Sequence, residues 1–303
     1  DIVIVELGGT IGDFEMFPFA EAIRQMAMET EHNNTMFIHV ALIYTLPSGE
    51  NKSKPTQHSI RKLQELGIQP DLLICRSSKA ISDDFRRKIG LLCGISPDCI
   101  IEGRDTKLVD EIPIRFERQG FASQVVRRLG LPDNPPTSSR WAEMVRVLRR
   151  PEGEVHIAVV GKYVKGTDAY LSVAEALKHG GIANRVAIKI HWVESGLLEN
   201  SNPEMTNNRE NGLNQVFQGI DGILVPGGFG VRGIEGMVVA VNYARRNQIP
   251  YLGLCLGMQI ATIEFARNVL QLEGAHSAEF DPGTAHPVIA LLDEQQNVTD
   301  KGG

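Results

Sequence analysis

Two kinds of segment alternate along this chain. Short runs of consecutive apolar residues, many of them β-branched, are separated by longer segments with the spacing of amphipathic helices. A strand that is apolar on both faces has to be covered on both faces, and connecting helices provide that cover in parallel sheets. The pattern therefore predicts an α/β fold with two doubly wound, mostly parallel sheets.

The pattern occurs twice, once on each side of a proline-rich break. In the first half it predicts strands at residues 2–5, 36–44, 71–75 and 99–102, and helices at 18–30, 57–66 and 86–93. In the second half it predicts strands at 155–160, 186–192, 220–225 and 251–254, and helices at 141–149, 169–179, 234–246 and 256–270. Residues 195–214 are polar and rich in asparagine, which predicts a long surface loop with room for one helix.

The break lies near residues 130–139, which hold three prolines and several turn-forming residues. At about 150 residues per domain, a length of 303 residues suggests two domains. We expect one domain over residues 1–131, a linker over 132–152 and a second domain over 153–303. Because the chain starts on an apolar run without a methionine, we also expect it to be an internal fragment of a longer protein.

The composition is that of an ordinary globular protein. The formal charge of −6 speaks against a nucleic acid polymer as the main partner, because phosphate binding needs concentrated lysine and arginine. Four cysteines are too few for a disulfide scaffold. No apolar run approaches the roughly 18 residues of a membrane span, and no signal peptide precedes the first predicted strand. We therefore expect a cytoplasmic location and no membrane partner.

Residues 253–257, with the sequence GLCLG, join a predicted strand to a predicted helix. This is the cysteine version of the G-x-S-x-G nucleophile elbow, in which small residues permit a tight turn and the helix N-terminus favours the thiolate. A buried structural cysteine is the alternative, and the elbow alone leaves the two interpretations even. A second motif, PGGFG at residues 226–230, follows another strand and lets backbone N–H groups approach a ligand, which favours a nucleophilic Cys255.

Together, LVPGGFG and YLGLCLGMQ resemble the class I glutamine amidotransferase family. The resemblance implies that Cys255 attacks the side-chain amide of glutamine, forms a thioester and releases ammonia. It implies an oxyanion hole at Gly228 and Leu256, and the glutamine-binding residues Gly228, Leu256, Gly257, Met258, Gln259 and Glu279. The family's catalytic histidine and its glutamate partner have no match, because the sequence around His276 and His286 differs. We expect both histidines to be structural or at the surface.

Two motifs in the first half suit a nucleotide. Glu6 and Asp13 lie in a glycine-rich turn after a predicted strand, where Mg²⁺ ligands are found in nucleotide-binding α/β proteins; a solvated turn is the alternative. Residues 52–58, KSKPTQH, place two lysines before a predicted helix start, which suits a phosphate chain; a solvated basic turn is the alternative.

The order of VELGGTIGDFE, EAIRQM, KSKPTQHS and GIQPDLLICRS resembles the synthetase domain of the CTP synthase family. In the second half, VGKY, DAYLSVAEALKHGG and VPGGFGVRGIEGM resemble the same family. The resemblance implies a synthetase domain like that of P-loop NTPases, followed by the amidotransferase domain. It also implies amination of UTP to CTP with ATP and with ammonia from L-glutamine, in a homotetramer whose nucleotide sites lie at subunit interfaces.

The resemblance implies a role for individual residues. Glu6 corresponds to a Mg²⁺ ligand, and Arg232 and Gly233 correspond to the loop for GTP, the allosteric activator. The residues implied for UTP and for the inhibitor CTP are Asp13, Phe14, Glu15, Lys52, Ser53, Lys54, Pro55, Thr56, Gln57 and Lys88. The residues implied for ATP are Arg76, Arg104, Asp105 and Thr106.

Parts of both sites are absent from the sequence. No G-x-x-x-x-G-K-S/T motif is present, since Gly161-Lys162-Tyr163 lacks the other residues of that motif. We therefore expect residues 1–303 alone to form no CTP. Two other functions stay open: an amidoligase that acts on cofactor acids, and a non-catalytic interaction protein derived from the enzyme.

Overall fold

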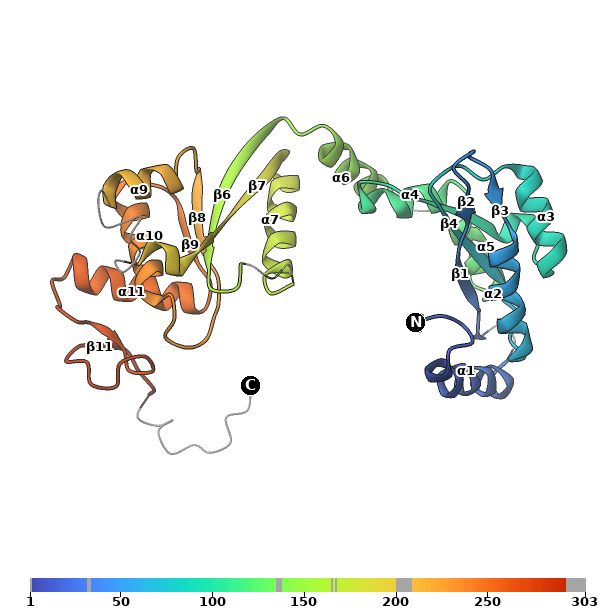
Figure 1. Ribbon diagram of the computed structural model, residues 1–303, viewed down its shortest axis with the longest axis horizontal. Helices are drawn as coiled ribbons and strands as arrows, with labels where there is room; N and C mark the ends of the chain where they lie inside the picture. The colour runs from blue at the N-terminus through green and yellow to red at the C-terminus, as the bar shows by residue number, and fades with distance from the viewer. Residues whose placement is uncertain are drawn as a thin grey trace. The chain divides into compact units, whose positions relative to one another are not determined.

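The computed structural model describes residues 2–31, 34–134, 138–164, 166, 168–199 and 209–292. The chain forms two compact units, Asp1–Val145 and Arg146–Gly303, each built on its own parallel sheet (Figure 1). The predicted linker at 132–152 stays a prediction, and its residues 135–137 lie outside the described residues. Residues 200–208 of the asparagine-rich segment also lie outside them, as do residues 293–303 of the predicted second domain.

The first unit is built on a sheet with the strand order β1-β4-β5. Its strands are β1 (Ile38–Leu42), β4 (Leu72–Ser77) and β5 (Ile100–Arg104), and a separate antiparallel pair is formed by β2 (Tyr44–Thr45) and β3 (Asn51–Lys52). The α-helices are α1 (Phe17–Glu29), α2 (Lys54–Glu65), α3 (Asp83–Cys93), α4 (Ile112–Glu117) and α5 (Phe121–Arg128), and the 3₁₀ helices are η1 (Phe14–Met16), η3 (Pro97–Cys99) and η4 (Val109–Glu111). Helix α6 (Ser139–Arg149) spans the boundary between the two units. All three sheet strands run parallel, so their carboxyl ends meet at one edge.

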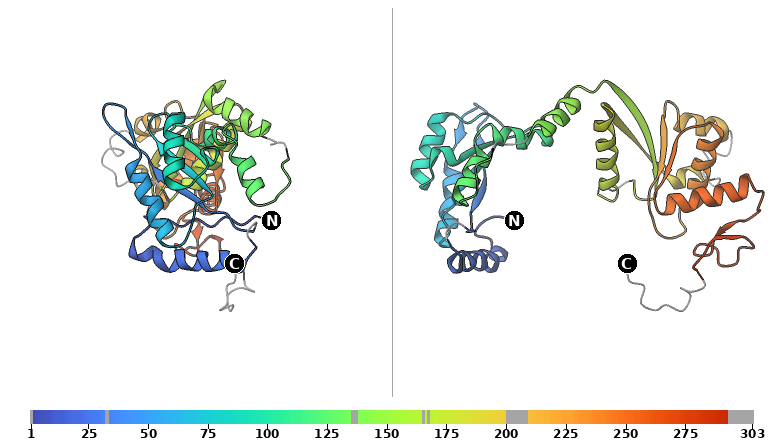
Figure 2. Two further views of the ribbon diagram at one scale, coloured as in Figure 1. Left: turned by 90° about the vertical axis from the view of Figure 1, so that its right-hand side faces the viewer. Right: turned by 180° about the vertical axis from the view of Figure 1, so that it is seen from behind.

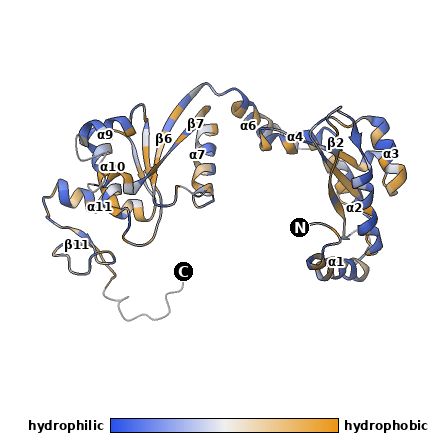
Figure 3. Ribbon diagram, viewed as in Figure 1, coloured by the Kyte–Doolittle hydropathy of each residue, from blue (hydrophilic) through white to orange (hydrophobic). Residues whose placement is uncertain are grey.

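Helices α2 and α3 cover one face of this sheet. Ile60 of α2 and Ile89 of α3 are fully buried against β1, β4 and β5, and burying a side chain of this size contributes about 1.5–3 kcal/mol. Helix α3 has a hydrophobic and a hydrophilic side, visible in Figure 3. It begins after Ser82, whose hydroxyl accepts a hydrogen bond in the first turn, and it ends at Gly94, whose φ of 69° suits a glycine.

The prediction of a strand at residues 2–5 is wrong for this structure. The segment has no strand partner, and the side chains of Val3 and Ile4 are 85% and 89% exposed. Among the described residues β1 pairs with β4 alone, so the apolar run lacks the backbone partner and the cover that a buried strand needs. Val40 and Leu42, on the face of β1 that points away from α2, are also exposed.

The second unit is built on a sheet with the order β7-β6-β8-β9, again entirely parallel. Its strands are β6 (Gly153–Gly161), β7 (Val186–Glu194), β8 (Gly222–Val225) and β9 (Tyr251–Gly253). Its helices are α7 (Leu171–Ala183), η5 (Ser195–Leu198), α9 (Arg209–Val216), α10 (Ile234–Arg246) and α11 (Leu256–Asn268). Two short strands, β10 (His276–Ser277) and β11 (Pro287–Ile289), form a small second sheet.

The four-stranded sheet of the second unit is covered on both faces. Met237 of α10 and Ile260 of α11 are fully buried in one core with Val160 and Val225 of the sheet. Helix α7 lies on the opposite face (Figure 2). This confirms the predicted doubly wound α/β arrangement, and helix α10 has the bounds predicted for it. The helices α4 and α5 and the two short strands β10 and β11 were not predicted.

No helix in the described part of the chain combines the length and the apolar character that crossing a membrane requires.

The buried His39 predicts a pH dependence of stability. Burial lowers the pKa of its imidazole, which hydrogen-bonds to the Ser59 hydroxyl at 2.9 Å. The unfolded chain therefore binds a proton more readily, and His39 makes the free energy of unfolding fall as the pH drops below about 6.5. We expect urea unfolding of His39→Gln to show a shallower pH slope than the wild type between pH 7.5 and 5, by at most about 1.4 kcal/mol per pH unit.

The same substitution at His58, which is exposed on α2, serves as the matched control. Equal slopes for the wild type and His39→Gln would contradict this account of His39.

Candidate functional site

Cys255 lies in the tight turn between β9 and α11. Its backbone has a φ of 52° and a ψ of −102°, a conformation that is strained for a residue with a side chain. The turn is held by hydrogen bonds from the N–H of Gly257 to the Leu254 carbonyl at 2.9 Å and from the N–H of Met258 to the Cys255 carbonyl at 3.1 Å. Strained backbone of this kind is typical of residues held for chemistry, and the predicted strand–turn–helix context of the elbow is present.

Two glycines allow helix α11 to start directly behind the sheet. A Cβ on Gly257 would lie 2.0 Å from the carbonyl oxygen of Val225, and a Cβ on Gly253 would lie 2.4 Å from the carbonyl carbon of Gly257. No side chain fits at either position.

Of the four cysteines, all of which the structure describes, Cys255 is the exposed one. Burial raises the pKa of the Cys75 thiol to about 12 and also raises the pKa of Cys93. Because the thiolate is the reactive form, these two buried cysteines are poor nucleophiles. Cys255 is accessible to a reagent or a substrate.

The glycine-rich loop after β8 lies beside the cysteine turn. A Cβ on Gly227 would lie 3.7 Å from Cβ of Cys255, and a Cβ on Gly228 would lie 3.4 Å from the Leu256 side chain. Three residues that the sequence singled out, Cys255, Gly228 and Leu256, thus come together at the carboxyl edge of the sheet. Within the described residues, the N–H of Leu256 has no backbone hydrogen-bond acceptor, so it is available to a ligand.

The ammonium group of a buried lysine binds carbonyl oxygens of this loop. Lys162 follows directly on β6 and is 3% exposed. Its ammonium group donates to the carbonyl of Phe229 at 3.1 Å and, through a very short contact, to the carbonyl of Gly230. Sequence reasoning considered Lys162 as part of an incomplete phosphate loop and of the VGKY resemblance, but assigned it no role. The available signal was its position directly after a strand end.

Arg232 and Gly233 begin the connection to α10. Arg232 donates to the Lys162 carbonyl at 2.7 Å and pairs with Glu194 at 3.4 Å. Gly233 has a φ of 77°, and a Cβ there would overlap the hydroxyl of Ser195. Both residues therefore lie next to the loop over Lys162.

The remaining candidates for glutamine binding lie around the same edge. Met258 is 54% exposed. The side-chain oxygen of Gln259 is buried and has no hydrogen-bond partner among the described residues. Glu279, in the segment after β10, is near enough to Lys162 for its negative charge to raise the pKa of that lysine. His276 has its own contacts, with Glu235 at 3.8 Å and with the Phe280 ring.

In the first unit, the predicted basic segment follows the carboxyl end of β1. Thr56 is buried and its hydroxyl donates to the Leu42 carbonyl, while the Gln57 amide donates to the Ser53 hydroxyl at 3.0 Å. Lys52 pairs with Glu50 at 2.6 Å. The adjoining Lys54 and Pro55 form the exposed first turn of α2.

The segment Arg104–Thr106 begins at the last residue of β5, at the same edge and beside the end of β4. Arg76 of β4 pairs with Asp105 at 3.4 Å, and the Asp105 N–H donates to the Ser77 carbonyl. The structure therefore brings Arg76, Asp105 and their neighbours together, as expected for parallel strands. Lys88 lies on the exposed side of α3.

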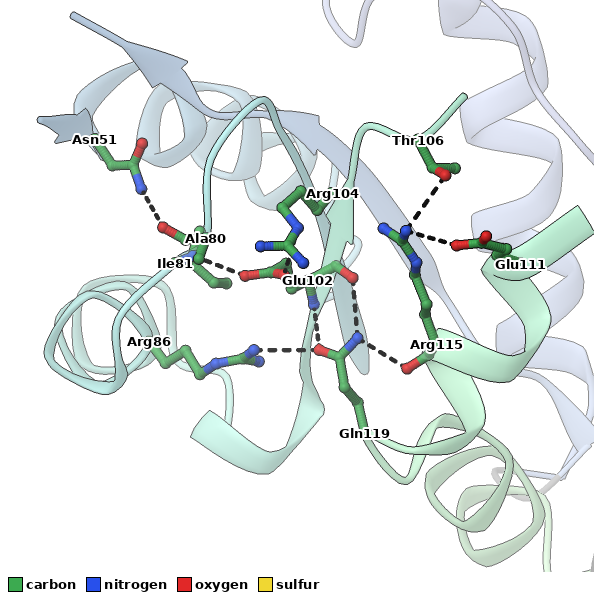
Figure 4. Close-up of polar contacts among 10 residues, drawn as sticks. All are labelled: Asn51, Ala80, Ile81, Arg86, Glu102, Arg104, Thr106, Glu111, Arg115 and Gln119. Carbon is green, nitrogen blue, oxygen red and sulfur yellow. Dashed lines mark hydrogen bonds and ion pairs between the residues drawn. The ribbon is translucent and has the colours of Figure 1, made fainter. Parts of the chain in front are cut away.

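A polar network that sequence reasoning missed braces this segment (Figure 4). Gln119 accepts the Glu102 N–H at 2.7 Å and donates to the Glu102 carbonyl at 3.0 Å. Arg115 contacts the Thr106 hydroxyl at 3.3 Å and Glu111 at 2.7 Å. The segment is thereby held at two points, the backbone of Glu102 and the side chain of Thr106.

Glu6, the predicted metal ligand, lies apart from the basic segment and from Arg104–Thr106. Glu6, Asp13 and Glu15 line a surface pocket of about 320 Å³ together with Met16 and Phe19. Phe14, between the last two acids, is 89% exposed. Within the described ranges, no group of three His, Cys, Asp or Glu side chains is close enough to hold a metal ion.

This acidic pocket is not joined to the basic segment. Gly12, next to the pocket, lies against the side chain of Lys62. Lys62 and Lys54 are eight residues apart on α2, which is about 12 Å along the helix axis. The two groups of candidate nucleotide-binding residues therefore lie toward opposite ends of α2.

Comparison with known proteins matches both halves of the chain. Residues 1–131 match the CTP synthase N-terminus family, and residues 166–299 match the class-I glutamine amidotransferase family. CTP synthases from Caldanaerobacter subterraneus subsp. tengcongensis and Methanocaldococcus jannaschii are 50% and 49% identical over 304 aligned positions, which cover 100% of this chain and 55% and 56% of those proteins.

A solved structure, the CTPS glutaminase domain of Trypanosoma brucei with bound acivicin, is 42% identical over 47% of this chain and 52% of its own, with a TM-score of 0.43. The chain thus spans about half the length of the curated relatives it matches. With its two halves matched in order and about half of its residues identical across its whole length, the chain belongs to the CTP synthase family.

Proposed function

We propose that the complete polypeptide carrying this sequence is an ATP-dependent ligase that aminates UTP to CTP with ammonia from L-glutamine. One observation carries the proposal: the exposed Cys255 in a strained strand–helix turn, with Gly228 and Leu256 beside it, in a chain that also carries the synthetase half. A nucleophile next to backbone donors is the arrangement that amide cleavage requires.

In the glutaminase half, the Cys255 sulfur attacks the carbonyl carbon of the glutamine side chain. The carbonyl oxygen becomes an oxyanion, which the N–H groups of Gly228 and Leu256 stabilise. Collapse of this intermediate releases ammonia and leaves a thioester, which water then hydrolyses to glutamate. Glu279 and Gln259 are suited to binding the polar groups of the substrate. The buried side-chain oxygen of Gln259 has no hydrogen-bond partner among the described residues.

In the synthetase half, the carboxyl edge of the sheet is suited to phosphate groups. Lys52 and Lys54 stand at the start of α2, where helix N–H groups add positive potential, and they suit the triphosphate of UTP. Arg76 and the braced segment Arg104–Thr106 suit ATP. ATP phosphorylates O4 of UTP, and ammonia displaces that phosphate.

Glu6 suits a single-carboxylate role toward Mg²⁺. The ion usually takes one or two protein carboxylates and completes its shell with water and phosphate oxygens, so the lack of a three-ligand cluster among the described residues fits this use. Glu6 is exposed on the wall of the acidic pocket, and its carboxylate oxygens are of the ligand type that Mg²⁺ binds. When bound, Mg²⁺ would screen the phosphate charge.

The separation of the acidic pocket from the basic segment supports a shared site. Asp13 and Glu15 lie toward one end of α2, and Lys54 stands at the other. We propose a homotetramer in which one subunit supplies the pocket and another supplies the lysines to UTP or to the inhibitor CTP. GTP, as activator, would act at Arg232 and Gly233. A cytoplasmic location stays a prediction from composition.

Replacing Cys255 separates the two half-reactions. We expect Cys255→Ala to abolish CTP formation from glutamine, because no thioester can form, and to leave CTP formation from added ammonium chloride within about twofold of the wild type. Product formation from UTP and ATP would be followed with each nitrogen source. Cys99→Ala, a cysteine substitution in the first unit, is the matched control.

Loss of ammonia-dependent activity in Cys255→Ala would indicate a role of Cys255 in folding. Formation of product from a cofactor acid in place of UTP would favour the alternative amidoligase.

Removing the Lys54 ammonium is expected to weaken UTP binding. Hydrogen bonds to charged groups contribute about 1.5–3 kcal/mol, so Lys54→Ala should raise the KM for UTP about tenfold or more while kcat for the ammonia-dependent reaction changes less. Lys189→Ala removes an exposed lysine of the second unit, which pairs with Glu154, and serves as the control. A KM for UTP raised equally in both variants would contradict this assignment.

A polypeptide limited to residues 1–303 is expected to form no CTP, because the sequence holds no Walker A phosphate loop and no match to the amidotransferase histidine. Incubation with UTP, ATP, Mg²⁺ and either nitrogen source, with detection of labelled CTP, tests this. Measurable glutamine-dependent CTP would refute it.

A further inference from the structure

Lys162 carries a buried charge that none of the assigned roles uses. Its side chain is 3% exposed, and a buried ammonium group is costly unless it is paired or hydrogen-bonded. Its partners are the carbonyl oxygens of Phe229 and Gly230. Both carbonyls belong to the loop that follows Gly228.

The groups around Lys162 come from several elements and converge on the same loop. The Tyr170 hydroxyl accepts the Lys162 N–H at 3.2 Å and reaches the Gly227 carbonyl at 3.5 Å. Burial and the nearby Arg232 guanidinium lower the pKa of Lys162, and the charge of Glu279 opposes this effect. The Phe280 ring lies 5.8 Å from the ammonium nitrogen.

The loop needs such a support because of its composition. Three of the five residues in PGGFG are glycines, whose backbone rotates freely, so the sequence alone does not fix the direction of any N–H group. An oxyanion donor acts only if it points at the developing charge before the reaction. A Cβ on Gly228 would lie 3.3 Å from the Lys162 stem, which shows how closely the lysine packs under that residue.

We infer that Lys162 is a positioning residue for glutamine hydrolysis: by binding the carbonyls of Phe229 and Gly230 it holds the loop so that the N–H of Gly228 faces Cys255. The inference rests on the proposed glutaminase function. Lys162 touches no reacting atom in this scheme; it acts through the loop.

The test uses Lys162→Met in the complete polypeptide, since methionine keeps an apolar stem and removes the ammonium group. Loss of one oxyanion donor costs about 10²–10³ in kcat, so a misdirected donor should lower kcat for glutamine hydrolysis by about 10- to 100-fold. The KM for glutamine should change less than about threefold, because ground-state binding is left in place. Ammonia-dependent CTP formation should be unchanged.

Alkylation of Cys255 by iodoacetamide provides a second readout, because this reaction forms no oxyanion. We expect its rate, followed by mass spectrometry of the Cys255 peptide, to stay within about twofold of the wild type. Lys189→Met, the same change at an exposed lysine that pairs with Glu154 at 3.7 Å, is the matched control and should match the wild type throughout.

Unchanged glutamine hydrolysis in Lys162→Met would overturn the inference. So would an equal loss of ammonia-dependent activity and of Cys255 alkylation, which would mark Lys162 as a general fold residue. Should Lys162→Met fail to fold, Lys162→Gln, which keeps one N–H donor group, should show an intermediate kcat, and a wild-type kcat would count against the inference. A wild-type protein that hydrolyses no glutamine would instead remove the proposed function itself.

Discussion

The close contact between the end of strand β8 and the first turn of helix α11 sets the position of the groups around Cys255. At Gly257 the two backbones approach so closely that a Cβ would lie 2.0 Å from the carbonyl oxygen of Val225. The Leu254 N–H, bonded to the same oxygen at 2.9 Å, ties the turn to the sheet. Because helix and strand cannot separate without losing these contacts and the core around Ile260, the strained backbone of Cys255 is held in place.

The two units use different side chains to hold the chain at the carboxyl edge of their sheets. In each, loops at the carboxyl edge of a parallel sheet must be held without regular hydrogen-bond ladders. In the second unit a buried cation, Lys162, binds loop carbonyls. In the first unit the side chain of Gln119 bonds to the backbone of strand β5 at Glu102, and Arg115 bonds to Thr106 in the segment just after that strand. In both units, long polar side chains thus hold the chain in place near the strand ends.

The elements that could be predicted are those whose local pattern determines them. Strand β8 and helix α10 lie in the core of the second unit, so their own apolar patterns indicate them, and the glycines around Cys255 are required by the turn itself. The strand at residues 2–5 was wrongly predicted because an apolar run becomes a strand only when a partner is present.

Sequence reasoning missed two polar residues that bind backbone groups near the candidate sites, for a different reason. Lys162 and Gln119 were missed because a single lysine or glutamine carries no local sign of burial. Their partners, Phe229 and Glu102, lie 67 and 17 residues away in sequence. The roles assigned to Glu6, Lys54 and Arg232 stay predictions, since each of these side chains is exposed and its position alone does not identify a ligand.

Helix α2 explains why a single copy of this chain holds its candidate nucleotide-binding groups apart. Ile60 and Leu63 pack into the core, so the helix is fixed against the unit and cannot bend to bring its two ends together. The acidic pocket lies beside Lys62, and Lys54 of the basic segment stands at the first turn. The homotetramer proposed above would resolve this separation, because in a symmetric assembly the negative groups of one copy would face the positive groups of another.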